Sequence, residues 1–182
     1  MSIPFSPNLS HFGLYCRSID DMAVFYRAVF DLVETDRGTG ITFPMDIVFL
    51  SSQPDQHHQL ALASGRAEGT ASTVMQLSFK VKSIDHLREA RQRALAHGAK
   101  NLRGLNHGNA LSIYFHDPEE NLVEVYLDTP WYVSQPHGDP LNLEHSDAEI
   151  WAETERNCRA DPTFLPLADW SSATFGKAKN PQ

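Results

Sequence analysis

A single carboxylate interrupts an apolar, strand-like run in the sequence NLVEVYLD. Glu124 stands between Val123 and Val125, and Tyr114 and Tyr126 are close to it along the chain. Removing a carboxylate from water without a partner costs several kcal/mol or forces it to take up a proton. A solvated strand face would carry more charge than this run does. We therefore expect a positive group beside Glu124, and a cation is the simplest choice.

Two segments of the chain share one layout and indicate an internal repeat. The first is HFGLYCRSIDDMAVFYRAVF, from His11, and the second is QLSFKVKSIDHLREARQRAL, from Gln76. Each has an alternating strand, then Ser-Ile-Asp, then a helical pattern, with Ser18 and Ser83 as predicted N-caps. The later runs IVFL and IYFH also correspond. The repeat predicts an α+β fold of tandem βαβββ modules that form a curved mixed sheet around a central site, with a C-terminal helical extension.

The repeat also aligns polar positions between the two modules. His11 aligns with Gln76, and carrying the register forward places His58 opposite Glu124. If the modules pair pseudosymmetrically, these four side chains converge on one axis. The predicted partner of Glu124 is then a cation held among His, Gln and Glu side chains.

Alternation and helical periodicity predict which residues form the core. Side chains at every second strand position share a face, and a helix buries one stripe. The expected helix-facing strand residues are Phe12, Leu14, Cys16, Leu77, Phe79 and Val81. The expected buried helix stripe, which stops at Gly98, is Leu87, Ala90, Ala94 and Leu95.

The chain divides into a repeat and an extension. We expect one domain at 8–131, with modules at about 8–66 and 72–128, then an extension at 132–170 and a frayed tail at 171–182. Ser146 and Glu149 predict a capping box for one helix in the extension. This helix would serve either as a covering element or as a lid over an aromatic substrate.

Composition excludes several classes of protein. The 182 residues are 41% hydrophobic and 21% charged, and the net charge is -8, which suits a globular protein and disfavours nucleic acid or anionic membranes as partners. No run is long enough to span a membrane, and the start lacks signal-peptide features, so a cytoplasmic location is expected. Cys16 and Cys158 are expected to be free thiols. We expect ordinary surface roles for the remaining histidines, His57, His86, His97, His116, His137 and His145.

The run NHGNALSIYFHDPEENLVEVY resembles the last-module signature of the vicinal oxygen chelate superfamily, which includes glyoxalases, bleomycin resistance proteins and type I extradiol dioxygenases. FLSSQPDQHHQLALAS with QLSFKVKSIDHLREA is similar to the metal-bearing module of the dioxygenases, and single-domain catechol 2,3-dioxygenase-like proteins look most alike. The resemblance covers roughly residues 8–131. It implies a divalent metal, usually Fe(II), with Mn, Zn, Ni or Co as other choices, bound by two histidines and one glutamate.

Carried over residue by residue, the resemblance gives each position a role. His11 and Glu124 match metal ligands, and His58 matches a catalytic histidine near the oxygen site. His107 matches an acid or base toward substrate, and Tyr114 matches a tyrosine that hydrogen bonds a substrate oxygen.

Gln76 departs from the dioxygenase pattern, because a second histidine ligand is expected there. An amide oxygen is a poorer ligand for Fe(II) than imidazole. Three outcomes follow: Gln76 binds the metal weakly, His58 becomes the third strong ligand, or the site holds no metal.

The function that the resemblance implies is a ring-cleaving dioxygenase of aromatic catabolism, an oxidoreductase acting on a catechol-like diol with O2. The alternatives are a glyoxalase-type isomerase, epimerase or lyase, and a non-catalytic protein that binds small molecules. A homo-oligomer, a dimer or larger, is expected.

Overall fold

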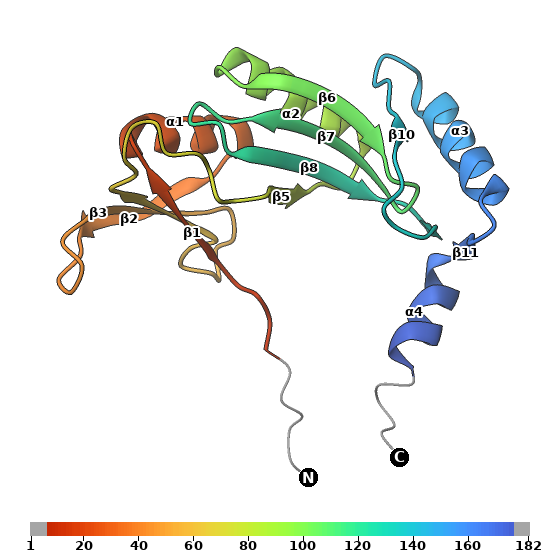
Figure 1. Ribbon diagram of the computed structural model, residues 1–182, viewed down its shortest axis with the longest axis horizontal. Helices are drawn as coiled ribbons and strands as arrows, with labels where there is room; N and C mark the ends of the chain where they lie inside the picture. Colours follow the sequence, from red (N-terminus) through yellow and green to blue (C-terminus); the bar gives the residue numbers. More distant parts are fainter. Residues whose placement is uncertain (1–6, 177–182) are drawn as a thin grey trace, which may run out of the picture. The chain divides into compact units, whose positions relative to one another are not determined.

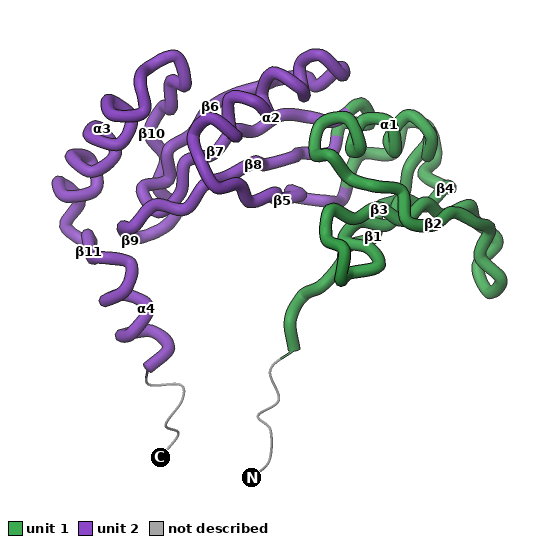
Figure 2. The backbone as a smooth tube through the Cα atoms, turned by 180° about the vertical axis from the view of Figure 1, so that it is seen from behind, with its two compact units in different colours: residues 1–72, 118–120 green, residues 73–117, 121–182 purple. Residues whose placement is uncertain are grey.

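The computed structural model describes residues 7–176. The chain forms two compact units, shown in different colours in Figure 2. Unit 1 comprises Met1–Ser72 with Pro118–Glu120, and unit 2 comprises Thr73–Asp117 with Asn121–Gln182. Unit 1 combines the first strand–helix–strand segment with Pro118–Glu120 of the second, and unit 2 contains the rest of the second segment and the extension.

Unit 1 has the predicted βαβββ order. Its elements are β1 (Phe12–Cys16), α1 (Ile19–Phe30), β2 (Val33–Thr39), β3 (Asp46–Ser51) and β4 (Leu60–Ser64). The strands form one sheet in the order β1-β4-β3-β2, in which β1 and β4 are parallel and the other neighbours are antiparallel (Figure 1). The first strand therefore returns beside the last one.

Unit 2 repeats this order. Its elements are β5 (Leu77–Lys80), α2 (Ile84–Ala96), β6 (Lys100–Asn106), β7 (Ala110–His116) and β8 (Leu122–Asp128). The sheet order is β10-β6-β7-β8-β5, where β10 (Asp139–Pro140) comes from the extension and β5 pairs with β8 in parallel. The prediction of two βαβββ modules is confirmed.

The helix starts are also confirmed, because local chemistry determines them. The Ser18 side chain accepts a hydrogen bond from the backbone nitrogen of Asp21, and Ser83 accepts one from that of His86. These bonds satisfy backbone donors that have no partner within the first helical turn. Gly98 follows α2 with φ +87, which a glycine adopts without strain.

Burial along the predicted faces is uneven. Leu14 and Cys16 are buried as expected, but Phe12 is 41% exposed, because it is the first residue of an edge strand. In α2, the stripe of Leu87, Ala90 and Ala94 is buried, whereas Leu95 is 51% exposed. Leu95 lies about 100° around the helix from Ala94, which places it at the margin of the stripe.

The predicted register between His58 and Glu124 is wrong. Within unit 2, Ser78 of β5 pairs with Glu124 of β8, and the equivalent pair in unit 1 is Gly13 with Ala61. His58 precedes β4 and lies in the connection 52–59, which is longer than the connection 117–121 of the second module. A constant offset in residue number between the two modules ignores this difference in loop length and therefore misaligns His58.

The extension contains more structure than the sequence predicted. It comprises β9 (Trp131–Tyr132), β10, α3 (Asp147–Ala160), β11 (Leu165–Pro166) and α4 (Leu167–Phe175). The capping box of α3 is confirmed. A single helix and a frayed chain from 171 onward were expected, but 171–175 belong to α4, where the Trp170 ring stacks on Tyr132. Residues 177–182 lie outside the described range.

Two further features concern the class of protein. Both cysteines, Cys16 and Cys158, are free and buried. Among residues 7–176, no helix combines the length and apolar character that crossing a membrane requires.

Candidate functional site

Glu124 is buried, with 8% of its surface exposed, and neutral donors surround its carboxylate. Oε1 accepts hydrogen bonds from Ser112 at 3.0 Å and from Tyr114 at 2.5 Å. Oε2 accepts from Ser78 at 2.6 Å and from Gln76 Nε2 at 2.9 Å. These four bonds position both oxygens, but they bring no positive charge to them.

The register of three neighbouring strands assembles this network. Ser78 of β5 and Tyr114 of β7 lie directly opposite Glu124 of β8 on its two sides. Ser112 is two residues before Tyr114, so its side chain projects from the same face of the sheet. Gln76 immediately precedes β5. The alternation in the sequence thus places a row of polar groups on one face.

Tyr114 continues the network to His107. The Tyr114 hydroxyl lies 2.8 Å from His107 Nε2, and His107 Nδ1 lies 2.7 Å from the backbone oxygen of His137. Burial, followed by the hydrogen bond to Glu124 and the charge of Glu124, raises the pKa of Tyr114 well above its usual range. Tyr114 therefore stays protonated and acts as a hydrogen-bond donor rather than as a phenolate base.

The Tyr114 hydroxyl connects Glu124 with His107. It has one hydrogen and two partners. When it donates to Glu124, His107 Nε2 must itself carry a hydrogen to complete its bond with Tyr114. The Tyr114 hydroxyl thus links Glu124 and His107 in one hydrogen-bonded series.

Unit 1 contains a cluster of histidines. The rings of His11 and His58 have centroids 4.4 Å apart, and the ring of Phe49 lies 4.9 Å from His58. Burial, followed by the charges of His11 and His57, lowers the pKa of His58. His58 therefore tends to remain neutral, with one ring nitrogen able to accept a proton or a metal.

His57 contributes to this cluster, although the sequence predicted an ordinary surface role. Its Nδ1 lies 3.0 Å from Nδ1 of His58, and its Nε2 lies 3.9 Å from a carboxylate oxygen of Asp36. One of the two Nδ1 atoms must donate to the other. His57 thus affects which nitrogen of His58 is free, and the only signal in the sequence was the His-His pair itself.

The structure joins four of the predicted site residues directly in unit 2, namely Gln76, His107, Tyr114 and Glu124, and two in unit 1, His11 and His58. Ser78 and Ser112 complete the hydrogen bonds to Glu124. Another residue that the sequence did not single out is Gln135, which donates to the backbone oxygen of His107. His137 was expected at the surface, but its side chain is only 20% exposed.

The chemistry of these side chains fits a divalent cation. Glu124 is a buried carboxylate whose side-chain contacts above are all with neutral groups, so a cation would offset its charge. Within unit 1, the neighbouring imidazoles of His11 and His58 are nitrogen donors of the kind that a divalent cation accepts. Within residues 7–176, however, no three His, Cys, Asp or Glu side chains form a ready-made metal site. A metal site must therefore include another donor, such as the Gln76 amide, or assemble its ligands when the ion binds.

Comparison with known proteins finds similarity to a dioxygenase and to a fosfomycin resistance protein. Biphenyl-2,3-diol 1,2-dioxygenase 3 of Rhodococcus globerulus is 24% identical over 169 residues, covering 90% of this chain and 80% of the relative. The structure of the fosfomycin resistance protein FosX of Listeria monocytogenes with Mn(II) and sulfate has a TM-score of 0.54 at 20% identity. That match covers 69% of this chain and 95% of FosX.

A second structure shows the same fold. A glyoxylase/bleomycin resistance protein/dioxygenase domain from Frankia sp. EAN1pec has a TM-score of 0.56 at 20% identity, covering 69% of this chain and 100% of that domain. The sequence profile of the Glyoxalase/Bleomycin resistance protein/Dioxygenase superfamily matches residues 8–125, which is more than half of the chain. This chain therefore belongs to that superfamily, as its resemblance to vicinal oxygen chelate proteins predicted.

Proposed function

We propose that this protein is a metal-dependent, ring-cleaving dioxygenase that acts on a small catechol-like diol with O2. The observation that carries the proposal is the series Glu124, Tyr114 and His107, in which a buried carboxylate is linked through a tyrosine to a histidine. The dioxygenase of Rhodococcus globerulus supports it, because the similarity extends over 90% of this chain.

The proposed metal ligands are His11 and Glu124, with Gln76 or His58 as the third. When bound, a divalent ion supplies the Lewis acidity that lowers the pKa of a catechol hydroxyl, and Fe(II) also supplies the redox chemistry that O2 requires. In this structure the Gln76 amide donates its nitrogen to Glu124. This contact favours His58 as the third ligand and leaves Gln76 to orient the carboxylate.

The protein side chains provide proton transfer. His107 is half-buried, and its Nε2 faces the Tyr114 hydroxyl, where it can give up or accept a proton. Tyr114, held protonated, passes that proton without becoming a charged intermediate. Where His58 is not a ligand, its lowered pKa makes it a proton acceptor near neutral pH. A group positioned in this way contributes about 10²- to 10⁴-fold to the rate.

Oxygen uptake tests the proposal. The protein is loaded with Fe(II) without air, and O2 consumption is then measured with a panel of catechols. We expect uptake with at least one diol, and an approximately 100-fold slower rate in His107→Gln. His97→Gln, at an exposed position after α2, is the matched control and should keep the full rate. Absence of uptake with every diol, despite bound iron, would reject the dioxygenase.

Gln76 supports a second candidate, a glyoxalase-type isomerase, epimerase or lyase that uses a metal without O2. With an amide at this position beside the carboxylate, the site has one histidine ligand fewer than the usual two-histidine, one-carboxylate iron site. Activity with Ni(II), Co(II) or Zn(II) in the absence of air would favour this candidate. A protein that binds no metal after loading would instead favour a non-catalytic binding function.

A further inference from the structure

We infer that Gln135 is a positioning residue that fixes which nitrogen of His107 carries a hydrogen. Gln135 lies beyond residues 8–125, which the superfamily profile matches. The inference rests on the proposed function only where it concerns the catalytic use of His107, because the effect on the imidazole can be measured without any reaction.

The side chain of Gln135 joins two backbone segments. Its Nε2 donates to the backbone oxygen of His107 at 2.8 Å, and its Oε1 accepts from the backbone nitrogen of His137 at 3.1 Å. Nε2 also lies 3.3 Å from Asn109 Oδ1 and 3.3 Å from the backbone oxygen of Val133. One amide therefore holds the backbone of His107 and that of His137 at a fixed separation.

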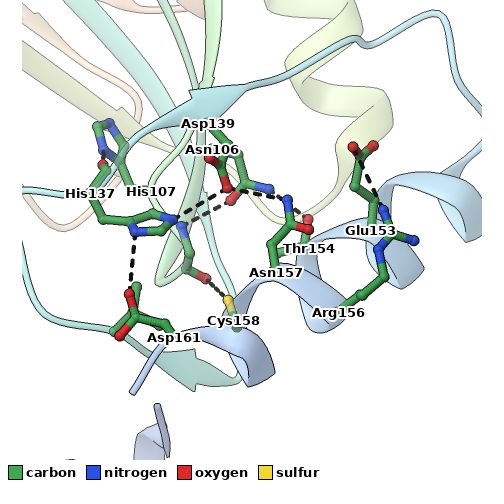
Figure 3. Close-up of polar contacts among 12 residues, drawn as sticks. Asn106, His107, His137, Asp139, Glu153, Thr154, Arg156, Asn157, Cys158 and Asp161 are labelled. Atoms are coloured by element: carbon green, nitrogen blue, oxygen red, sulfur yellow. Dashed lines mark hydrogen bonds and ion pairs between the residues drawn. The ribbon is translucent and has the colours of Figure 1, made fainter. Parts of the chain in front are cut away.

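That separation determines the hydrogen bond of the His107 ring. Figure 3 shows His107 beside the backbone of His137, whose carbonyl oxygen lies 2.7 Å from Nδ1 of His107. A carbonyl oxygen only accepts hydrogen bonds, so Nδ1 must carry the hydrogen. Nε2 is then the nitrogen that exchanges a proton with Tyr114.

Close packing around Gly108 keeps the loop in place. Gly108 has φ +73, and a Cβ there would lie 2.4 Å from Val133 Cγ2 and 3.3 Å from Cys158 Sγ. The backbone oxygen of Gly108 also accepts from Thr129 Oγ1 at 2.6 Å and from Cys158 at 3.5 Å. These close contacts hold the backbone at Gly108. They therefore help to keep the adjacent His107 where its contact with Gln135 places it.

The experiment observes the ring nitrogens of His107 directly. Protein labelled with 15N at histidine is freed of metal with a chelator, and long-range 1H–15N correlations are recorded at pH 8, with His107→Gln used for assignment. We expect Nδ1 of His107 to be protonated in the wild type. In Gln135→Ala, where the amide contacts to His107 and His137 are lost, the fraction of His107 that carries a hydrogen on Nδ1 should fall.

Gln135→Glu provides a second, independent variant. It keeps an acceptor for the His137 nitrogen but turns a carboxylate oxygen toward the backbone oxygens of His107 and Val133. We expect a shift at least as large as in Gln135→Ala. Gln92→Ala, at an exposed position on α2, is the matched control and should leave the signals unchanged. The inference would be overturned by an unprotonated Nδ1 in the wild type. It would also be overturned if both Gln135 variants were folded and gave the same His107 signals as the wild type.

A kinetic readout separates this inference from the proposed function. With an active diol, Gln135→Ala should lower kcat about 10-fold, as for other partners that orient a catalytic imidazole, with KM changed less than twofold. Loss of Nδ1 protonation without any oxygen uptake by the wild type would reject the dioxygenase and support the positioning role. Oxygen uptake by the wild type, together with unchanged His107 signals in the variants, would support the dioxygenase and reject the positioning role.

Discussion

The hydroxyl of Tyr114 donates to Oε1 of Glu124 across two neighbouring strands, β7 and β8. Because the same hydroxyl contacts His107, replacing Tyr114 would interrupt the proposed proton transfer between Glu124 and His107. We expect Tyr114→Phe to lower kcat about 100-fold with little change in KM, measured by oxygen uptake. Tyr126→Phe, two residues from Glu124 in β8, is the control and should retain most activity. Equal rates in both variants would contradict a role of the Tyr114 hydroxyl in proton transfer.

Glu124 itself allows a test of stability without any substrate. In Glu124→Gln, an amide group that cannot accept replaces one oxygen, so two of the four donors lose their acceptor. We expect a loss of about 2 kcal/mol in the free energy of unfolding, measured with urea on metal-free protein. Glu144→Gln, at an exposed ion pair with Arg91, should change it by less than about 0.5 kcal/mol. A more stable Glu124→Gln would show that burial of the charge outweighs its hydrogen bonds.

Local chemistry explains what could be predicted from the sequence. The caps at Ser18, Ser83 and Ser146 involve residues three positions apart, and strand alternation follows from the pleat itself. The same alternation placed Tyr114 and Glu124 on one face. Two βαβββ modules and much of the network in unit 2 were therefore accessible from the sequence.

Contacts between distant parts of the chain were not accessible in this way. The position of His58 depends on the length of the connection 52–59, which the repeat does not determine. Gln135 meets His107 through a backbone oxygen, a contact that leaves no pattern of side-chain types in the sequence. Glu119, in the connection between β7 and β8, accepts a hydrogen bond from the backbone nitrogen of Arg17, which is far away along the chain.

Replacing Gln76 tests whether this position lies at the proposed metal site. Imidazole is a stronger ligand for Fe(II) than an amide oxygen, so Gln76→His should increase Fe(II) affinity at least about 10-fold. Competition with a chromogenic chelator under anaerobic conditions measures this change. Gln92→His, on the exposed side of α2, tests for nonspecific binding by an added histidine and should have no effect. Unchanged affinity in Gln76→His would show that this position does not contact the metal.

His58 makes stability depend on pH. Burial and the neighbouring imidazoles of His11 and His57 lower its pKa in the folded protein, whereas the unfolded value is near 6.5. Below about pH 6.5 the unfolded chain takes up a proton that the folded chain resists, so stability falls as the pH is lowered. Its contribution is complete above this pH.

Replacement of His58 should therefore flatten the pH dependence. In His58→Gln, the free energy of unfolding of metal-free protein should fall less steeply between pH 7 and pH 5, by at most about 1.4 kcal/mol per pH unit. Urea unfolding at several pH values measures the slope, and His86→Gln, at an exposed position on α2, should keep the wild-type slope. A steeper slope in His58→Gln would reverse the sign of the argument.

Glu119 stabilises unit 1 at the start of α1. Its carboxylate accepts from the backbone nitrogens of Arg17 and Ser18, both at 2.7 Å, and lies 3.6 Å from the guanidinium of Arg66. The side chains of Glu119 and Arg66 are each 6% exposed, so removing the carboxylate takes a neighbouring negative charge away from a buried cation and leaves two backbone donors without this acceptor. We expect Glu119→Ala to cost about 3 kcal/mol in urea unfolding. The exposed Glu68→Ala should cost less than about 0.5 kcal/mol, and equal losses would show that the charge of Glu119 has no structural role.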